Sequence, residues 1–129
     1  MNRTHIPHTP HPAAPVGSAL VLAGGWAFAR GLLPLDLAEP GKPLAESVEE
    51  QSRQIMRNLD SLLAAHGLAR RQVVAVTVHL RQMSRFGARF ERVYADFFEA
   101  AGAPTRALVG VSDLPREALV AMDFVVHAG

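Results

Sequence analysis

The segment from residue 47 to residue 67 constrains the fold most, because it carries signals for both ends of an amphipathic helix. Ser47 stands three residues before Glu50, the spacing of a capping box in which the serine side chain accepts a hydrogen bond from the Glu50 amide. Apolar residues then recur at helical spacing through Leu63, and Gly67 can close the helix in a left-handed cap. We therefore expect one long helix that buries a single face.

Strand patterns precede and follow this helix. Residues 16–22 are mostly apolar, Gly24-Gly25 permits the positive φ angles of a tight hairpin, and residues 26–31 alternate bulky and small side chains. The proline-rich stretch 32–44 is predicted to be a loop. Residues 72–80 are rich in β-branched side chains, which indicates a strand buried on both faces.

A second helix is expected from about Ser84, with an apolar stripe that extends to Phe98, and further strands are expected at 106–111 and 119–127. The resulting order, ββαβαββ, predicts an α+β fold in which two helices cover one face of a single mixed sheet. The other face needs a cover, and we expect a second copy of the chain to supply it.

Length and charge limit the classes of function. The 129 residues fit one domain, 16–129, preceded by a Pro/His-rich arm, 1–15, that is either loosely held or an edge segment. A formal net charge of +1 argues against nucleic-acid binding. The absence of cysteine excludes disulfides, thiolate nucleophiles and Cys-ligated zinc. The apolar stretches are too short to span a bilayer and no secretory signal is visible, so we expect a cytoplasmic protein without a membrane partner.

Three histidines in the arm, His5, His8 and His11, are spaced three residues apart. This spacing leaves two interpretations open, a metal site or a solvated tail. We favour the solvated tail, because nothing nearby in the sequence would hold the three rings rigidly. No metal is therefore expected.

Several segments in this order resemble the RidA (YjgF) family, also labelled endoribonuclease L-PSP. The resemblance spans nearly the whole chain, from about residue 16 to residue 127, and this sequence looks like a divergent member. It rests on Arg30-Gly31-Leu32-Leu33-Pro34, the helix 48–63, the helix end 93–98, and Pro104-Thr105-Arg106 followed by Leu114-Pro115. The resemblance implies a chorismate-mutase-like fold and a homotrimer with three clefts between subunits. In the best-known branch these clefts hydrolyse enamines and imines, such as 2-aminoacrylate, to keto acids and ammonia without metal or cofactor.

The resemblance also implies substrate-binding residues. Arg106 falls on the arginine that binds the substrate carboxylate, a task that suits a permanently charged guanidinium. The backbone of Gly31 would lie against the ligand, and backbone groups near Val109 would hold its polar atoms. Arg30 stands where serine is usual, and Glu91 replaces an asparagine.

Ala121 is the main departure from the family pattern, because active deaminases have a glutamate there that handles the attacking water. Asp123, two residues on and about 7 Å away on the same strand face, is the candidate catalytic residue instead. Leu108 also stands where a cysteine is common. The expected function is therefore that of an enamine or imine deaminase. The alternative is a catalytically weak or inactive trimer that binds keto acids as a regulatory protein.

Each candidate residue also has a structural interpretation. Arg106 could form a surface salt bridge at the start of its strand, and Asp123 could pair with an arginine of a neighbouring subunit. Arg30 could stack on aromatic rings or pair with Asp36. For His79, a satisfied core or interface histidine is favoured over a general base.

Overall fold

The computed structural model describes residues 2–8 and 17–129. Its main elements are eight in these ranges: β1 (Arg3–Pro7), β2 (Ser18–Ala23), β3 (Trp26–Leu32), α1 (Val48–Ala64), β4 (Val73–Arg81), α2 (Met83–Tyr94), β5 (Thr105–Val111) and β6 (Val120–His127). Short 3-10 helices occupy Arg70–Gln72, Ala100–Gly102 and Pro115–Glu117. The order matches the predicted ββαβαββ with one further strand, β1, in front.

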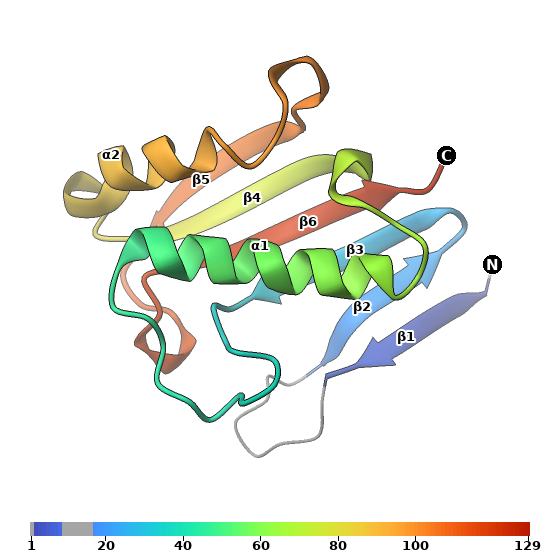
Figure 1. The fold of residues 1–129 in the computed structure, drawn as a ribbon, viewed down its shortest axis with the longest axis horizontal. Helices are drawn as coiled ribbons and strands as arrows, with labels where there is room; N and C mark the ends of the chain where they lie inside the picture. Colours follow the sequence, from blue (N-terminus) through green and yellow to red (C-terminus); the bar gives the residue numbers. More distant parts are fainter. Residues whose placement is uncertain (1, 9–16) are drawn as a thin grey trace.

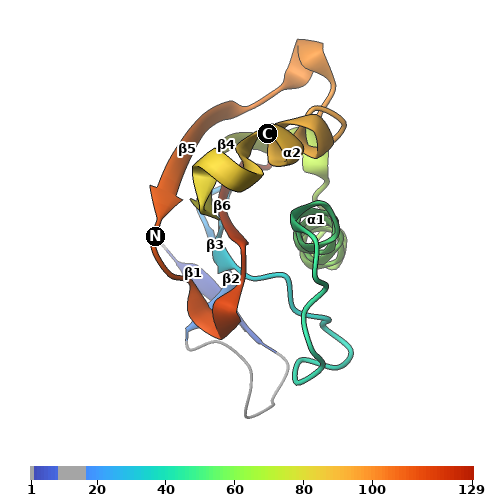
Figure 2. The same ribbon diagram turned by 90° about the vertical axis from the view of Figure 1, so that its left-hand side faces the viewer.

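The described strands form a single six-stranded sheet in the order β1-β2-β3-β6-β4-β5. β4 and β5 pair in parallel, and every other neighbouring pair is antiparallel. Figure 1 shows α1 running across β3 and β6 while α2 lies beside β4 and β5, and Figure 2 shows that the opposite face of the sheet carries no helix. This confirms the predicted α+β fold, a mixed sheet with two helices on one face.

β1 is an edge strand, which is one of the two interpretations that the sequence allowed for the arm. It pairs with β2 in an antiparallel register from Arg3↔Ala23 to Pro7↔Ser18, with an irregularity between Ile6 and Pro7. This part of the predicted arm therefore belongs to the sheet. His11 and the rest of residues 9–16 lie outside the described part of the chain.

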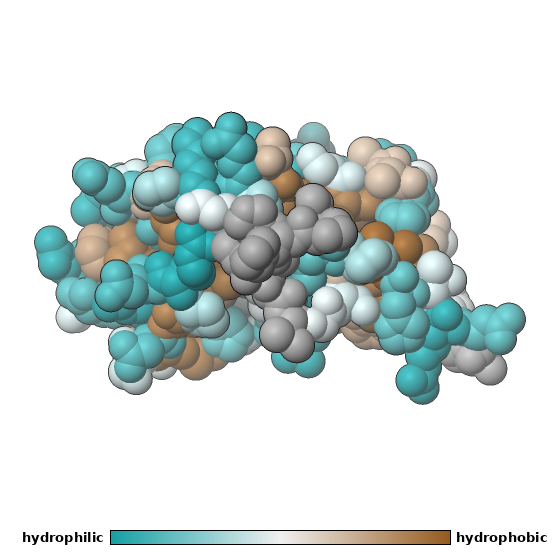
Figure 3. All heavy atoms as spheres, turned by 90° about the horizontal axis from the view of Figure 1, so that it is seen from below, coloured by the Kyte–Doolittle hydropathy of each residue, from teal (hydrophilic) through white to brown (hydrophobic). Residues whose placement is uncertain are grey.

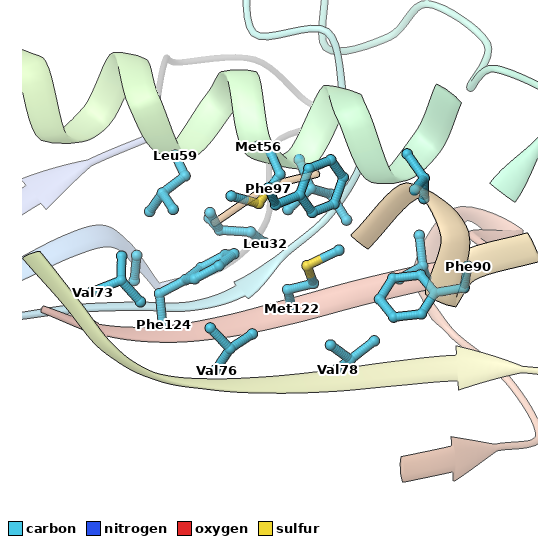
Figure 4. Packing of buried hydrophobic residues seen from close by; sticks show 14 of the residues in the cluster. Leu32, Met56, Leu59, Val73, Val76, Val78, Phe90, Phe97, Met122 and Phe124 are labelled. Carbon is cyan, nitrogen blue, oxygen red and sulfur yellow. The ribbon is translucent and has the colours of Figure 1, made fainter. Parts of the chain in front are cut away.

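α1 begins as the capping box predicts. The Ser47 hydroxyl accepts a hydrogen bond from the Glu50 amide at 3.1 Å, and Gly67 has the positive φ of 71° expected beyond the helix end. The buried face of α1 packs on Met122 and Phe124 of β6, which point from the sheet towards the helix in Figure 4. The main core therefore lies in one layer between sheet and helices, and a smaller buried cluster is formed by Leu33, Leu35, Ala118 and Ala121. Its largest fully buried side chains are Leu20, Val48, Ile55, Met56, Leu59, Leu63, Val78, Leu80, Phe90, Val120, Met122 and Phe124.

Alternation along the strands separates a core face from an open face. In β3, Ala27 and Ala29 are buried while Trp26 and Phe28 are 40% and 38% exposed. The expectation that 72–80 is buried on both faces is wrong for the single chain, because only alternate residues from Val76 onward are fully buried. The helices cover one face alone, so the other side chains of β4 stay partly exposed.

The lower surface of the molecule in Figure 1 is seen face-on in Figure 3, where hydrophilic areas separate smaller hydrophobic ones. No helix within the described ranges is long and apolar enough to cross a membrane.

Candidate functional site

Two polar clusters contain the residues that the sequence singles out. The first, which we call the Arg106 cluster, consists of Glu91 and Tyr94 on α2 and Arg106 on β5. Both terminal nitrogens of Arg106 donate to the Glu91 carboxylate, with Nη2 to Oε2 at 2.8 Å, and the guanidinium carbon lies 4.8 Å from the centre of the Tyr94 ring. The salt bridge proposed as the structural interpretation of Arg106 is thus present, with Glu91 as its partner.

Charge and burial in the Arg106 cluster follow from this pairing. Hydrogen bonding to Arg106 holds the pKa of the Glu91 carboxyl below its ordinary value and outweighs the opposite effect of partial burial. Burial raises the pKa of the Tyr94 phenol, whose hydroxyl has no hydrogen-bond partner in the described part of the chain. The pair is ionised at neutral pH, so the cluster has little net charge to attract an anion.

Arg106 nevertheless keeps donors for a ligand. A guanidinium has five N–H groups, and two of those of Arg106 go to Glu91. The others have no partner among the residues that the structure describes. The side chain is 27% exposed at the edge of the sheet, where an organic anion can reach it.

The second group, the Asp123 cluster, comprises Arg30 and Gly31 on β3, His79 on β4 and Asp123 on β6. Asp123 Oδ1 accepts the Gly31 amide at 2.6 Å, while Oδ2 lies 3.3 Å from Arg30 Nη2 and 3.2 Å from His79 Nε2. Arg30 therefore pairs with Asp123 of its own chain. Asp36, suggested as its partner, lies 3.8 Å from Lys42 instead.

The surroundings of Asp123 keep it ionised. Burial by itself raises the pKa of this carboxyl, but the hydrogen bonds from Gly31, His79 and Arg30 and the charge of Arg30 together hold the pKa below its ordinary value. Such a carboxylate is a weak proton acceptor near neutral pH, because its charged form is the one that the donors stabilise. Its geometry suits holding Arg30, Gly31 and His79 in place.

A bulge at Gly31 creates the backbone donor for Asp123. The register between β3 and β6 shifts between Ala29 and Leu32, and Gly31 has a φ of 65°, in the left-handed region that glycine tolerates best. The Gly31 amide is thereby directed at the Asp123 carboxylate, so it is not free to donate to a ligand in this arrangement.

Side chains on α1 and on the β5–β6 connection fix the loop that follows Gly31. Asn58 Nδ2 donates to the carbonyls of Leu33 and Leu35, at 3.4 and 2.8 Å, and Arg116 Nη1 donates to the Pro40 carbonyl at 2.9 Å. Between this loop, β2 and α1 lies a cavity of about 80 Å³ that Gly31 borders. The cavity is on the helix side and does not involve the Arg106 cluster.

The two clusters lie on opposite faces of the sheet. Glu91 is on α2, and Arg106 pairs with it, so the Arg106 cluster is on the helix side. Asp123 alternates along β6 with the core residues Met122 and Phe124, so its side chain faces the open side. Val109, on the edge strand β5, is 40% exposed on the open side, where its register partner is His79. A single chain therefore does not gather the predicted site residues into one pocket.

Sequence reasoning missed the contact between His79 and Asp123. The alternation of side chains along the two strands could have predicted it. His79 and Asp123 each lie between buried apolar neighbours, which places both on the face away from the helices. The pairing of Glu91 with Arg106 had no such signal. Within the described ranges, no three His, Cys, Asp or Glu side chains gather as potential metal ligands.

The structure is thus that of a small α+β protein with one mixed sheet, two helices on one face, and one polar cluster on each face of the sheet. A family model described as Endoribonuclease L-PSP matches residues 7–128. A RutC family protein of Pyrococcus horikoshii is 32% identical over 120 residues, which cover 93% of this chain and 92% of the relative. The chain belongs to the RidA/YjgF/L-PSP (RutC) family, and the predicted resemblance is confirmed.

Two further comparisons concern a relative with a named activity and a solved structure. Reactive Intermediate Deaminase A, chloroplastic, of Arabidopsis thaliana is 32% identical over 108 residues, covering 84% of this chain and 56% of the relative. The crystal structure of yeast Mmf1 matches with a TM-score of 0.85 and 28% identity, covering 99% of this chain and 100% of that chain. The family thus includes reactive intermediate deaminases, and the fold is shared along the whole length.

Proposed function

We propose that this protein is an enamine or imine deaminase that hydrolyses 2-aminoacrylate-type compounds to keto acids and ammonia in the cytoplasm. The observation that carries the proposal is Arg106, a part-exposed guanidinium at the sheet edge that is held over Tyr94 and keeps N–H donors for a carboxylate. Membership of a family that includes a reactive intermediate deaminase supports it. Hydrolysis of an imine needs only water and proton transfer, so the proposal invokes no metal or cofactor.

We further propose that the cleft forms between subunits of a homotrimer. The placement of the Arg106 cluster and the Asp123 cluster on opposite faces supports this, because one chain cannot direct both at the same ligand. The open face also exposes Trp26, Phe28 and Val109, an apolar surface that a second copy can cover. In such a trimer, each cleft would combine the Arg106 cluster of one chain with the Asp123 cluster of its neighbour.

The deaminase proposal has a direct test. Purified protein is mixed with 2-aminoacrylate or 2-iminopropionate generated in situ, and the release of ammonia and keto acid is followed for the wild type and for Arg106→Ala. The wild type is expected to exceed the buffer rate and Arg106→Ala to lose most of the excess. Arg71→Ala is the matched control, because Arg71 is exposed and has no ion-pair partner among the described residues. A wild type that never exceeds the buffer rate refutes the proposal.

A second candidate is a trimeric protein that binds keto acids without turnover and serves a regulatory role. Two observations favour it: Glu91 already occupies two donors of Arg106, and Ala121 offers no proton-transferring group. Saturable binding of 2-ketobutyrate to a protein that releases no ammonia from 2-aminoacrylate would select it. The expectation of no nucleic-acid partner stays a prediction, and a filter-binding assay with RNA at low salt checks it.

A further inference from the structure

The imidazole of His79 is oriented by a buried carboxylate. Asp123 Oδ2 lies 3.2 Å from His79 Nε2, and an ionised carboxylate can only accept hydrogen bonds. The proton of a neutral His79 ring is therefore on Nε2, and Nδ1 carries a lone pair. Nδ1 has no hydrogen-bond partner within the described ranges. A histidine held in one tautomer by a carboxylate, with its second nitrogen free, is arranged to accept a proton from water.

The position of His79 matches this arrangement. Its side chain is 30% exposed on the open face, whereas the Asp123 side chain behind it is 12% exposed. The ring therefore reaches the surface that the fold leaves uncovered, while the group that orients it is largely shielded from water.

The strand register supplies a second, independent observation. His79 on β4 is the direct antiparallel partner of Ala121 on β6. Side chains directly opposite each other in such a pair have Cβ atoms about 4.5–5.5 Å apart. The methyl group of Ala121 is 4% exposed and cannot transfer a proton, whereas the ring of His79 is part-exposed directly opposite it on the neighbouring strand.

We propose that His79, oriented by Asp123, is the group that transfers protons during imine hydrolysis in this protein. The proposal rests on the proposed deaminase function and assigns its missing base. Asp123, the candidate catalytic residue from the sequence, then acts as a positioning residue that orients His79. The role favoured for His79 from the sequence alone, a satisfied core or interface histidine, is the alternative that the experiment must distinguish from this one.

The reaction balances with water as the only co-reactant. Nδ1 of neutral His79 takes a proton from water while the water oxygen bonds to the iminium carbon and the C=N π electrons move to nitrogen. The protonated ring, stabilised by Asp123, then returns the proton to the amine nitrogen. The C–N bond breaks, the hydroxyl proton leaves with ammonia as ammonium, and the keto acid forms with His79 neutral again.

The groups packed around His79 leave its ring as the one that can exchange a proton in this cluster. Arg30 Nη2 of β3 and His79 Nε2 both lie against the same oxygen of Asp123, Oδ2, and Arg81, two residues on along β4, donates to the carbonyls of Glu117 and Ala118. The directly opposed residues on the neighbouring strands, Ala121 and Val109, carry no charge. In the described part of this cluster, Arg30 is permanently charged and Asp123 accepts three hydrogen bonds, so the group left to accept a proton is Nδ1 of His79.

The test compares His79→Gln with the wild type and with His66→Gln. His66 lies in the turn that follows α1 and makes no side-chain hydrogen bond among the described residues. We expect kcat/KM for 2-iminopropionate to fall about 10²-fold or more in His79→Gln and to be unchanged in His66→Gln. Added 4-methylimidazole should restore part of the rate.

The outcomes separate the two proposals. If the wild type releases no ammonia above the buffer rate, the deaminase function fails and the role of His79 fails with it. If the wild type is active and His79→Gln is within twofold of it, His79 is only structural and the deaminase function stands. If His79→Gln does not assemble, Asp123→Asn supplies the test, because a kcat/KM within twofold of the wild type overturns the role of the Asp123–His79 pair.

Discussion

The guanidinium of Arg106 on β5 is held by both carboxylate oxygens of Glu91 on α2. The residue expected to bind a substrate carboxylate thus already binds a carboxylate of its own chain. An incoming acid must either use the remaining N–H donors of Arg106 or displace Glu91, and in both cases it approaches a negative charge. Glu91 is therefore expected to weaken the binding of simple anions.

Removing the charge of Glu91 should strengthen the binding of keto acids. We expect Glu91→Gln to bind 2-ketobutyrate about tenfold more tightly by isothermal titration calorimetry, a change of about 1.4 kcal/mol. Glu50→Gln is the matched control, because Glu50 pairs with Arg53 on α1 and not with Arg106. Weaker binding by Glu91→Gln than by the wild type would show that Glu91 holds Arg106 in its binding position.

Asp123 should stabilise the fold at neutral pH and lose this effect in acid. Its folded pKa lies below the ordinary value, because the donors from Gly31, His79 and Arg30 outweigh burial. The carboxylate therefore contributes stability above about pH 4, which is lost as the pH falls through the lower folded pKa. We expect Asp123→Asn to lower the free energy of unfolding at pH 7 by about 1–3 kcal/mol in urea titrations.

The same titrations at lower pH supply the check. The difference between wild type and Asp123→Asn should shrink from about pH 4 downwards, whereas the exposed Asp113→Asn should follow the wild type throughout. A difference that stays constant to pH 2 contradicts an ionised, hydrogen-bonded Asp123.

Gly31→Ala should destabilise the protein through backbone strain alone. Gly31 has a φ of 65°, and a Cβ atom built there has no other atom within 4 Å. We expect a loss of about 1–2 kcal/mol in chemical denaturation, the cost of a left-handed conformation. Gly110→Ala is the comparison: its Cβ would come within 3.2 Å of the flexible Met83 Cε without a positive φ, so a smaller change is expected. Equal losses at the two positions would refute the explanation.

Ser47→Ala should lower stability by removing the helix cap. The Ser47 hydroxyl accepts from the Glu50 amide, and loss of such a cap costs about 1 kcal/mol. Ser61→Ala, at an exposed position inside α1, should leave the midpoint of urea denaturation unchanged or raise it. If the two variants unfold at the same urea concentration, the cap contributes nothing measurable.

Elements with local signals were predicted from the sequence. Ser47 and Gly67 mark α1 within a few residues, and Gly24-Gly25 places the β2–β3 hairpin, where both glycines have positive φ. β1 lacked such a signal, because Arg3–Pro7 has no apolar periodicity and becomes a strand only by pairing with β2. Alternation along β4 was also missed, since valine and alanine dominate the first half of the strand and His79 alone was too weak a signal to separate its two faces.

Single residues of the candidate site could be predicted from the sequence, but the contacts between them could not. Arg106, Gly31 and Asp123 could be named from the sequence, and each lies in a polar cluster. Their partners could not be named, because the contact of Glu91 with Arg106 depends on how α2 packs beside β5. The contact of Arg30 with Asp123 likewise depends on the bulge at Gly31.

Placing Arg106 and Asp123 on opposite faces of one sheet has a kinetic consequence. If each cleft combines the Arg106 cluster of one subunit with the Asp123 cluster of its neighbour, a dissociated subunit carries half of two different sites and no complete site. Specific activity would then rise with protein concentration and reach a plateau only when association is complete. Mixing Arg106→Ala with His79→Gln subunits would regenerate some intact clefts from two inactive parents.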